Sequence, residues 1–357
     1  MDVALKIWRF DPETGERALH EYEVDAPEWA CLLDVLDLIK DKHDGTLAYR
    51  KSCRMMICGS CGMRMDGRAV LACKERMKPI VDAGHVPVIS AMGNMPVLKD
   101  LVVDMAPFWG KIRAVKPWLD PGYDEVAEKE RVVSQQQMNV IHKEALCIMC
   151  GCCVSECNSM EADPEFLGPA ALAKGMRFVG DARDHADVER LNTLNEEHGI
   201  WDCTRCYFCN ERCPKGVDPR DAIAKLGAES VKEGVDHDMG AKHAKWFVRS
   251  AETTGWLRET ELVPKTQGIW AAIKQTGFAL KLARHGKVPP PFPPHVAADV
   301  DEARALHDLV KTQGREGALG VVQGEHALSR IEFTEEAGAR RNAPEIQPGV
   351  EPPPAEG

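Results

Sequence analysis

The sequence predicts an α+β fold with three parts: a small domain built on a β-sheet, an all-helical domain and a helical C-terminal extension. Three observations support this. Apolar residues alternate near the N-terminus, helical spacings dominate from the middle of the chain, and most cysteines fall into three tight groups. The 357 residues suffice for two or three domains. We expect their limits at residues 1–115, 116–240 and 241–357.

The first forty or so residues predict strand, turn, strand and helix. Apolar residues alternate with polar ones in two segments separated by a turn at residues 11–15, and a helical spacing follows. The residues that set these patterns are Val3, Leu5 and Ile7, then Tyr22 and Val24, then Leu32, Val35, Leu36 and Ile39. Cys31 precedes the helix, and we expect a small buried hydrophobic residue there rather than a metal ligand.

The first cysteine group has the C-x4-C-x2-C…C spacing of a plant-type 2Fe–2S site. Gly59 and Gly62 would let the backbone approach such a cluster, so that amide N–H groups point at its sulfurs. Asp66-Gly67 predicts a hairpin turn, which places the last ligand at the end of a strand. The candidate 2Fe–2S ligands are Cys53, Cys58, Cys61 and Cys73.

Two further cysteine runs, at residues 147–157 and 203–213, have the spacing of bacterial 4Fe–4S ferredoxins once Cys152 is left out. In that pattern three cysteines of a run hold one cubane and the fourth holds the other. This crossover rule assigns Cys147, Cys150, Cys153 and Cys213 to the first 4Fe–4S cluster, and Cys157, Cys203, Cys206 and Cys209 to a third cluster. Cys152 fits no step of the run, so we expect a packed thiol, the alternative being an alternate ligand.

Composition excludes several classes of function. A formal net charge of −11 argues against a nucleic-acid-binding protein. Twelve of the 14 cysteines lie in metal-ligand spacings and no signal peptide is evident, which favours a reducing, cytoplasmic compartment over disulfides. No apolar run approaches the roughly 20 residues that span a bilayer. Structural zinc is the alternative use of the C-x2-C pairs, and iron–sulfur clusters are favoured over it.

Residues 49–74, 96–104 and 116–119 resemble the iron–sulfur subunit of succinate dehydrogenase and fumarate reductase. The resemblance covers about residues 1–240, and the extra cysteine and the C-terminal extension make this an atypical member. It implies a β-grasp ferredoxin-like domain followed by a helical ferredoxin-like domain. It also implies a partner flavoprotein subunit that holds FAD, a membrane anchor subunit, and a peripheral position on the cytoplasmic face of the membrane.

The resemblance further implies that this chain carries electrons and has no substrate-binding catalytic site of its own. In succinate dehydrogenase, electrons from a flavin on the partner pass singly through three clusters toward quinone at the anchor. A fumarate reductase or a heterodisulfide-reductase-like complex would use the same type of subunit, and both stay open as alternatives. The extension also resembles, more weakly, parts of the small iron–sulfur subunits of the latter complexes.

Two departures from the family bear on the third cluster and on quinone. The family commonly has a 3Fe–4S cluster there and lacks the cysteine that stands here at Cys206, so we expect 4Fe–4S, with 3Fe–4S as the alternative. Residues that help form the family's quinone pocket follow Cys157, yet here only Ser159 keeps its type. Glu161 and Thr204 replace residues expected near quinone, so we expect quinone to bind elsewhere.

Other segments carry weaker predictions. Residues 107–123 contain several prolines and predict a linker, while 124–145, 169–174 and 187–197 predict helices. Asp218 is expected to cap a helix that starts with Pro219. In the extension, residues 242–253 and 268–284 predict amphipathic helices, followed by basic residues up to Lys287. They would dock on protein or lie on a membrane surface. We expect an extended linker at 287–295, a helix at 299–311 and a disordered tail from about residue 343.

Overall fold

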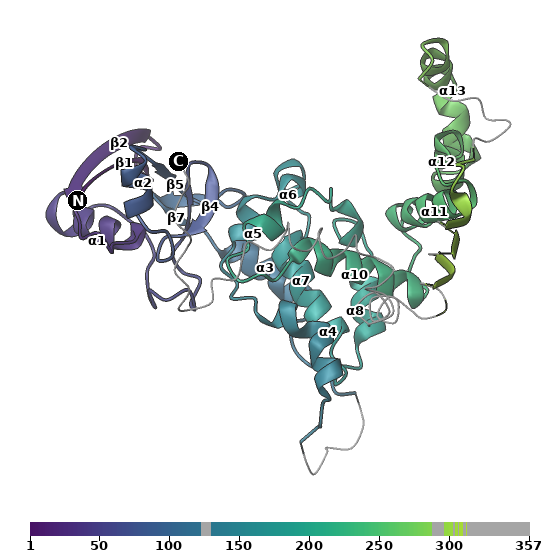
Figure 1. The fold of residues 1–357 in the computed structure, drawn as a ribbon, viewed down its shortest axis with the longest axis horizontal. Helices are drawn as coiled ribbons and strands as arrows, with labels where there is room; N and C mark the ends of the chain where they lie inside the picture. Colours follow the sequence, from purple (N-terminus) through teal and green to yellow (C-terminus); the bar gives the residue numbers. More distant parts are fainter. Residues whose placement is uncertain (123–129, 288–295, 303, 306, 310–311, 313–357) are drawn as a thin grey trace, which may run out of the picture. The chain divides into compact units, whose positions relative to one another are not determined.

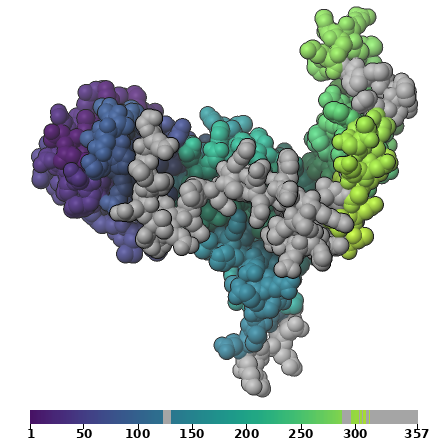
Figure 2. Space-filling view, in the orientation of Figure 1, coloured from purple at the N-terminus to yellow at the C-terminus, as the bar shows by residue number. Residues whose placement is uncertain are grey.

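A computed structural model describes residues 1–122, 130–287, 296–302, 304–305, 307–309 and 312 (Figure 1 and Figure 2). The chain divides into two compact units, Met1–Lys242 and His243–Gly357. The predicted limits at residues 115 and 240 stay predictions. The expected linker at 287–295, the helix at 299–311 and the C-terminal tail lie wholly or partly outside the described residues. No helix in the described part of the chain is long and apolar enough to cross a bilayer.

A five-stranded mixed sheet organises the N-terminal part of the first unit. Its strand order is β2-β1-β5-β3-β4, with β1 antiparallel to β2 and parallel to β5. The strands are β1 (Asp2–Phe10), β2 (Arg17–Asp25), β3 (Gly62–Met65), β4 (Arg68–Leu71) and β5 (Val88–Ser90). Val3, Leu5 and Ile7 are buried in one core with helix α1 (Leu32–Lys42), as their alternation predicts. Helix α2 (Lys78–Asp82) and the short pair β6 (Val97–Lys99) and β7 (Val102–Val103) complete this part.

The predicted hairpin is present, and its turn has the backbone conformation that an Asp-Gly sequence favours. β3 and β4 pair antiparallel, and the two turn residues Asp66 and Gly67 have φ of 53° and 75°. Positive φ at both positions gives a two-residue turn whose twist matches that of the strands. The hairpin thereby sets Cys61 and Cys73 just outside its two ends.

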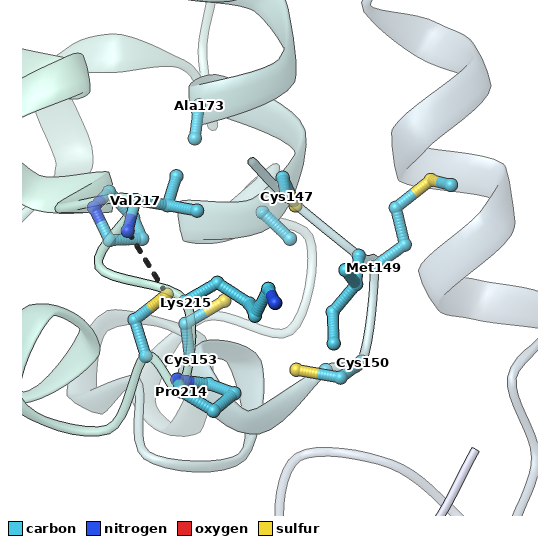
Figure 3. Close-up of a pocket in the computed structure, with 13 residues that line it drawn as sticks. Cys147, Met149, Cys150, Cys153, Ala173, Pro214, Lys215 and Val217 are labelled. Carbon is cyan, nitrogen blue, oxygen red and sulfur yellow. Dashed lines mark hydrogen bonds between the residues drawn. The ribbon is translucent and has the colours of Figure 1, made fainter. Parts of the chain in front are cut away.

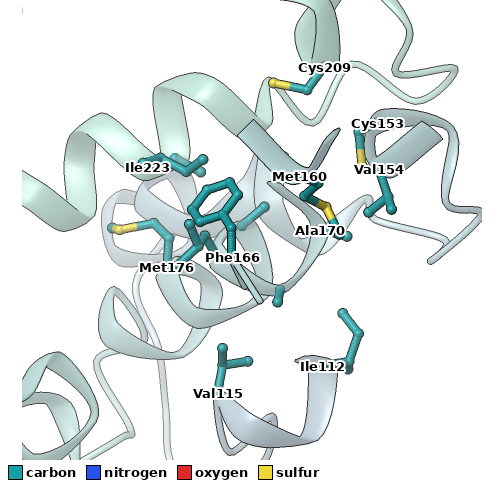
Figure 4. Close-up of a cluster of buried hydrophobic side chains, with 14 of the residues drawn as sticks. Ile112, Val115, Cys153, Val154, Met160, Phe166, Ala170, Met176, Cys209 and Ile223 are labelled. Carbon is teal, nitrogen blue, oxygen red and sulfur yellow. The ribbon is translucent and has the colours of Figure 1, made fainter. Parts of the chain in front are cut away.

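A helical core follows, with α7 (Gly168–Val179) at its centre. Small residues along Gly168-Pro-Ala-Ala-Leu-Ala let neighbouring helices approach closely, and α7 contacts α3, α4, α5, α8 and α10. Phe166, just before α7, is fully buried among Met160, Met176 and Ile223 (Figure 4). The helices are α3 (Ala106–Ala114), α4 (Gln135–Ala145), α5 (Cys152–Ser155), α6 (Asn158–Ala162), α8 (Asp187–Leu194), the 3-10 helix η1 (Ile200–Asp202), α9 (Phe208–Glu211) and α10 (Pro219–Lys232).

The predicted linker at 107–123 is wrong over its first half, where α3 lies. Phe108, Ile112 and Val115 are spaced four and three residues apart, so they share one helix face and pack into the helical core. Pro107 sits in the first turn, where its missing N–H costs nothing. The prolines of this segment therefore mark the start and the end of a helix.

Other helix limits differ from the sequence-based predictions for local reasons. α4 begins only at Gln135, because Ser134 and Gln137 form a capping box. α7 runs on to Val179, well beyond the predicted residue 174, whereas α8 ends at Leu194. Asp218 precedes α10 but does not cap it. At φ 55° its carboxylate turns away and accepts a hydrogen bond from Lys143 Nζ at 2.5 Å.

The second unit contains helical segments, as predicted, with one helix that the sequence did not suggest. α11 (Met239–Thr254) begins at the end of the first unit, and α13 (Ile269–Arg284) matches the second predicted amphipathic segment. Between them lies α12 (Glu259–Thr266), which contains Pro264. Proline in a helix interior is unfavourable, so the sequence of this segment does not by itself favour a helix.

A buried ion pair secures α8 to the loop before it. Arg190 and Asp184 have side chains 1% and 0% exposed, and Arg190 Nη2 lies 2.9 Å from Asp184 Oδ2. The same guanidinium donates to the Trp118 carbonyl at 3.2 Å and lies over the Phe178 ring. Removing one partner of such a pair leaves an uncompensated buried charge.

Asp184→Asn should therefore destabilise the protein by about 3–5 kcal/mol, because Arg190 stays buried without its counter-ion. The measurement is the midpoint of thermal unfolding by circular dichroism, at equal iron content. Glu189→Gln is the matched control, since its exposed pair with Lys116 should contribute less than about 1 kcal/mol. Equal shifts of the two variants would contradict this prediction.

Candidate metal centres

In the loop of Cys53 and Cys58, backbone amide groups point at the sulfur atoms of both cysteines. The amides of Met55, Ile57 and Cys58 donate to Cys53 Sγ at 3.4, 3.3 and 3.3 Å, and those of Cys53 and Ser60 point at Cys58 Sγ at 3.5 Å. Arg54, Met56 and Gly59 adopt positive φ of 61°, 59° and 70°, which turns successive N–H groups inward. Amides aimed at thiolate sulfur are what a negatively charged iron–sulfur site requires.

The four cysteines of this first group differ in environment. Burial raises the pKa of Cys58, but hydrogen bonds from Ser60 and Cys53 outweigh it and lower that pKa to about 6. Burial raises the pKa of Cys61 to about 12, and its hydrogen bonding with Cys73 shows that these two thiols are neighbours. Cys53 and Cys73 are partly exposed. Metal binding would displace the remaining protons, since the thiolate is the ligand.

The first cubane candidates share one cavity although they come from both runs. Cys147, Cys150 and Cys153 line it together with Cys213, and Val217 N donates to Cys213 Sγ at 3.4 Å (Figure 3). Ala170, Ala173 and Pro214 supply apolar walls, and Lys215 supplies a cation. Four thiols with one nearby cation have the composition that a cubane site requires, and the assignment of Cys213 to this cluster stays a prediction.

The third group brings Cys157 of the first run together with the second run. Burial raises the pKa of Cys209 to about 12, and the neighbouring thiols Cys203, Cys157 and Cys206 act in the same direction. Cys209 is buried, Cys157 and Cys203 are partly buried, and Cys206 is exposed. The four sulfurs are thus close enough to interact, with Cys206 on the solvent side.

The backbone around Cys206 repeats the backbone around Cys150. In the first run Met149 and Gly151 flank Cys150 with φ of 54° and 82°; in the second, Arg205 and Tyr207 flank Cys206 with φ of 58° and 68°. A one-turn helix follows in each case, α5 and α9, with Cys153 and Cys209 at its second residue. Tyr207 adopts a conformation that costs roughly 1–2 kcal/mol outside glycine. Such strain concentrates at functional sites.

The cysteines outside the expected ligand sets are placed differently from one another. Cys152 is fully buried in the core of the N-terminal part, as expected of a packed thiol. Cys31 is not the buried hydrophobic residue that was predicted. It is half-buried at the start of α1, because its thiol turns toward the partly exposed carboxylate of Asp34 and donates to Oδ2 at 3.0 Å.

The residues near the family's quinone pocket are also defined. Ser159 Oγ accepts a hydrogen bond from Thr204 N at 3.1 Å, which joins the two runs beside the third group. Glu161 is exposed and lines the rim of an apolar cavity of about 400 Å³ with Phe108 and Met160. Its carboxylate is therefore solvated in this chain, and the cost of burying it arises only if a partner covers it.

The first and second cysteine groups meet at one glycine. A Cβ added to Gly59 would lie 2.9 Å from Cys150 Cα and 2.9 Å from the Ile148 carbonyl oxygen. Only glycine allows this approach, and its φ of 70° also favours glycine. The loop of the 2Fe–2S candidates thus packs directly on the loop of the first cubane candidates.

Two polar residues that sequence reasoning missed hold the same junction. Arg64 Nε, on β3, lies 2.9 Å from Glu156 Oε1 and 3.0 Å from Ser155 Oγ. Asn94 Nδ2 donates to the carbonyls of Val154 and Cys157 at 2.8 and 2.9 Å. An arginine in a hairpin and an asparagine in a loop carry no spacing signal, so only the folded chain reveals these contacts.

Two family models match the chain in the expected order. Residues 4–110 match a 2Fe–2S iron–sulfur cluster binding domain, and residues 145–217 match a 4Fe–4S dicluster domain. The fumarate reductase iron–sulfur subunit of Escherichia coli is 38% identical over 234 residues, which cover 65% of this chain and 94% of the relative. The chain belongs to the family of iron–sulfur subunits of fumarate reductase and succinate dehydrogenase.

Other relatives of this iron–sulfur subunit carry either enzyme's name. The succinate dehydrogenase iron–sulfur subunit of Coxiella burnetii is 33% identical, over 65% of this chain and 98% of the relative. The 8-methylmenaquinol:fumarate reductase iron–sulfur subunit of Wolinella succinogenes is 34% identical over 289 residues, 80% of this chain and 90% of the relative. A chain from the Mycobacterium smegmatis Sdh1 complex in the apo form superposes with a TM-score of 0.60 at 26% identity, over 66% and 98% of the two chains.

The family membership settles the broad chemistry of this iron–sulfur subunit. It is an electron-transfer subunit of an oxidoreductase complex, with 2Fe–2S and 4Fe–4S binding domains. Both matched models describe iron–sulfur domains, which decides against structural zinc. The α+β prediction is confirmed in its main division, an N-terminal ferredoxin domain followed by a helical region.

Gly59→Ala should reduce loading of two clusters, because the added methyl group collides with the Cys150 loop as well as straining its own. We expect the electron paramagnetic resonance signals of both the 2Fe–2S and the first 4Fe–4S cluster to weaken, with less iron per chain. Gly67→Ala is the matched control. It has a similar positive φ of 75° but nothing within 4 Å, so it should cost only about 1–2 kcal/mol of backbone strain. Equal iron content in the two variants would refute the contact.

Proposed function

We propose that this subunit carries single electrons from a flavoprotein subunit that holds FAD toward quinone at a membrane anchor, in the direction of succinate oxidation. The observation that carries the proposal is the placement of three thiol groups within one compact unit, two of them in contact at Gly59. Iron–sulfur clusters, when bound, supply one-electron chemistry tuned by hydrogen bonds, charge and burial. The chain would sit peripherally on the cytoplasmic face of the membrane.

The proposed ligand sets follow the cysteine groups. Cys53, Cys58, Cys61 and Cys73 would hold the 2Fe–2S cluster, and Cys147, Cys150, Cys153 and Cys213 the first 4Fe–4S cluster. The amides around Cys53 would stabilise negative charge on the first site, and Lys215 would offset negative charge at the second. These groups of the chain would thus hold the clusters in place and offset their negative charge. The oxidation of succinate would take place on the flavoprotein partner.

Fumarate reduction is the second candidate, favoured by the names of the relatives from Escherichia coli and Wolinella succinogenes. In that direction the same clusters would carry electrons from the anchor to the flavoprotein.

The test is a complex purified through a tag on this chain, with its subunits identified. Succinate-dependent dye reduction is expected to exceed fumarate-dependent oxidation of reduced viologen. The reverse ratio would establish a fumarate reductase. A complex with neither activity and a heterodisulfide-reductase-like partner would overturn both readings.

The third cluster is proposed to be 4Fe–4S, with Cys206 as the ligand of its fourth iron beside Cys157, Cys203 and Cys209. The support is the repeated backbone geometry: Cys206 occupies the place in its run that Cys150 occupies in the first. The solvent exposure of Cys206 fits the alternative, a 3Fe–4S cluster from which this thiol points away.

Cys206→Ala should convert the third cluster to 3Fe–4S, because the fourth iron loses its only thiolate. Electron paramagnetic resonance of the air-oxidised complex would then show a new 3Fe signal, and the cluster's potential should rise as negative charge is removed. Cys152→Ala, which removes a buried cysteine of the first run, should leave the signal of the third cluster unchanged. A strong 3Fe signal already present in the intact wild-type complex would sink the assignment.

We propose that quinone reacts within the anchor subunit. It would not bind against the residues after Cys157, which help form the quinone pocket in other members of the family. Ser159 is engaged with Thr204, and Glu161 would place a carboxylate where an apolar ring should meet quinone. The third cluster site would then pass electrons to a group held by the anchor.

A further inference from the structure

Helix α13 presents an unusual amount of apolar surface. Its 16 residues include no buried side chain, and Trp270, Ile269 and Phe278 are 79%, 71% and 64% exposed. Ile273 and Leu280 are exposed as well. Scattered exposed apolar residues are ordinary, but a helix that gathers them marks a surface that binds something else.

Part of the apolar surface of α13 forms a face with basic residues on its flank, whereas Phe278 lies on the opposite side of the helix. Ile269, Ile273 and Leu280 are four and seven residues apart, so they share one face, and Trp270 borders it. Lys274 and Lys281, seven residues apart, lie together beyond Trp270 on the flank of this face. A helix with an apolar face edged by tryptophan and lysine is typical of segments that lie in the membrane interface.

The charge of this region is opposite to that of the chain. Residues 262–287 contain no aspartate or glutamate, whereas the whole chain has a formal net charge of −11. The cations of the segment are Lys265, Lys274, Lys281, Arg284 and Lys287. A segment whose charged side chains are all basic is complementary to anionic lipid headgroups, which attract such residues by roughly 1 kcal/mol each.

The length of α13 decides how it would meet a bilayer. Sixteen residues extend about 24 Å, less than the roughly 30 Å of the hydrocarbon core. Lys274 lies within the helix, where a spanning segment would place apolar residues. The helix therefore suits a position parallel to the surface, with Ile269, Ile273 and Leu280 toward the acyl chains.

We propose that α13 is a membrane-surface helix that binds anionic lipid headgroups and attaches this subunit directly to the bilayer. The contact is additional to any anchor subunit. The ligand is a lipid surface. Three features of the segment suit the interface between membrane and water: its charged side chains are all basic, a tryptophan borders its apolar face, and that face is exposed. The proposal does not depend on the direction of electron flow or on the identity of the flavoprotein.

The test measures partition of the purified full-length chain onto vesicles with about one third anionic phosphatidylglycerol in phosphatidylcholine. The variant Lys274→Gln/Lys281→Gln/Arg284→Gln should bind roughly a hundredfold more weakly, from three lost charges. Wild-type binding should also weaken strongly at about 1 M salt. The matched control, Lys42→Gln/Arg68→Gln/Lys99→Gln, removes three exposed cations elsewhere and should bind like the wild type.

Two further measurements distinguish insertion of α13 into the membrane interface from loss of helical structure in the variants. Trp270 fluorescence, taken as the difference between the wild type and Trp270→Phe, should shift to the blue on anionic vesicles as the indole leaves water. Far-ultraviolet circular dichroism should show unchanged helix content in the triple variants. No binding of the wild-type chain, equal loss in both triple variants, or equal binding to pure phosphatidylcholine would each overturn the proposal.

Discussion

The packing of Gly59 against the backbone of Cys150 is the contact on which the arrangement of the first unit depends. Two cysteine loops that lie about ninety residues apart in sequence can touch only because one of them has no side chain at that point. Arg64 and Asn94 then bind the carbonyls and the carboxylate of the same segment. Contact and charge together fix the distance between the two sites, which single-electron transfer requires to be short and constant.

The second constraint is local and occurs twice. Each run turns through a left-handed residue before its second cysteine and another after it, and then forms a single helical turn that carries the third cysteine. Glycine serves the later position in the first run, whereas Tyr207 serves it in the second. The Arg220 guanidinium lies over the Tyr207 ring, 4.4 Å from its centroid. This cation–π contact helps stabilise the left-handed backbone conformation of Tyr207, which is unfavourable for a residue other than glycine.

Features set by short-range chemistry could be predicted from the sequence. The cysteine spacings, the Asp66-Gly67 turn and the alternation in β1 depend on neighbours a few residues apart, and each points to the correct local structure. Arg64, Asn94 and Ser155 could not be found this way, because their partners lie far along the chain. The same limit explains Asp218, whose carboxylate binds Lys143 instead of its own helix, and α3, whose apolar stripe is short and begins with proline.

The sharing of core residues has a consequence for how the chain is made. Cys150 and Cys152 are buried with the sheet residues, while Met92, Met95 and Val103 are buried with the helices. A ribosome releases the N-terminal segment first, at about 5–20 residues per second. The sheet cannot complete its core until residues beyond Cys152 have emerged. Nascent chains would therefore expose apolar surface of the sheet for several seconds, which lengthens the interval in which a chaperone can bind.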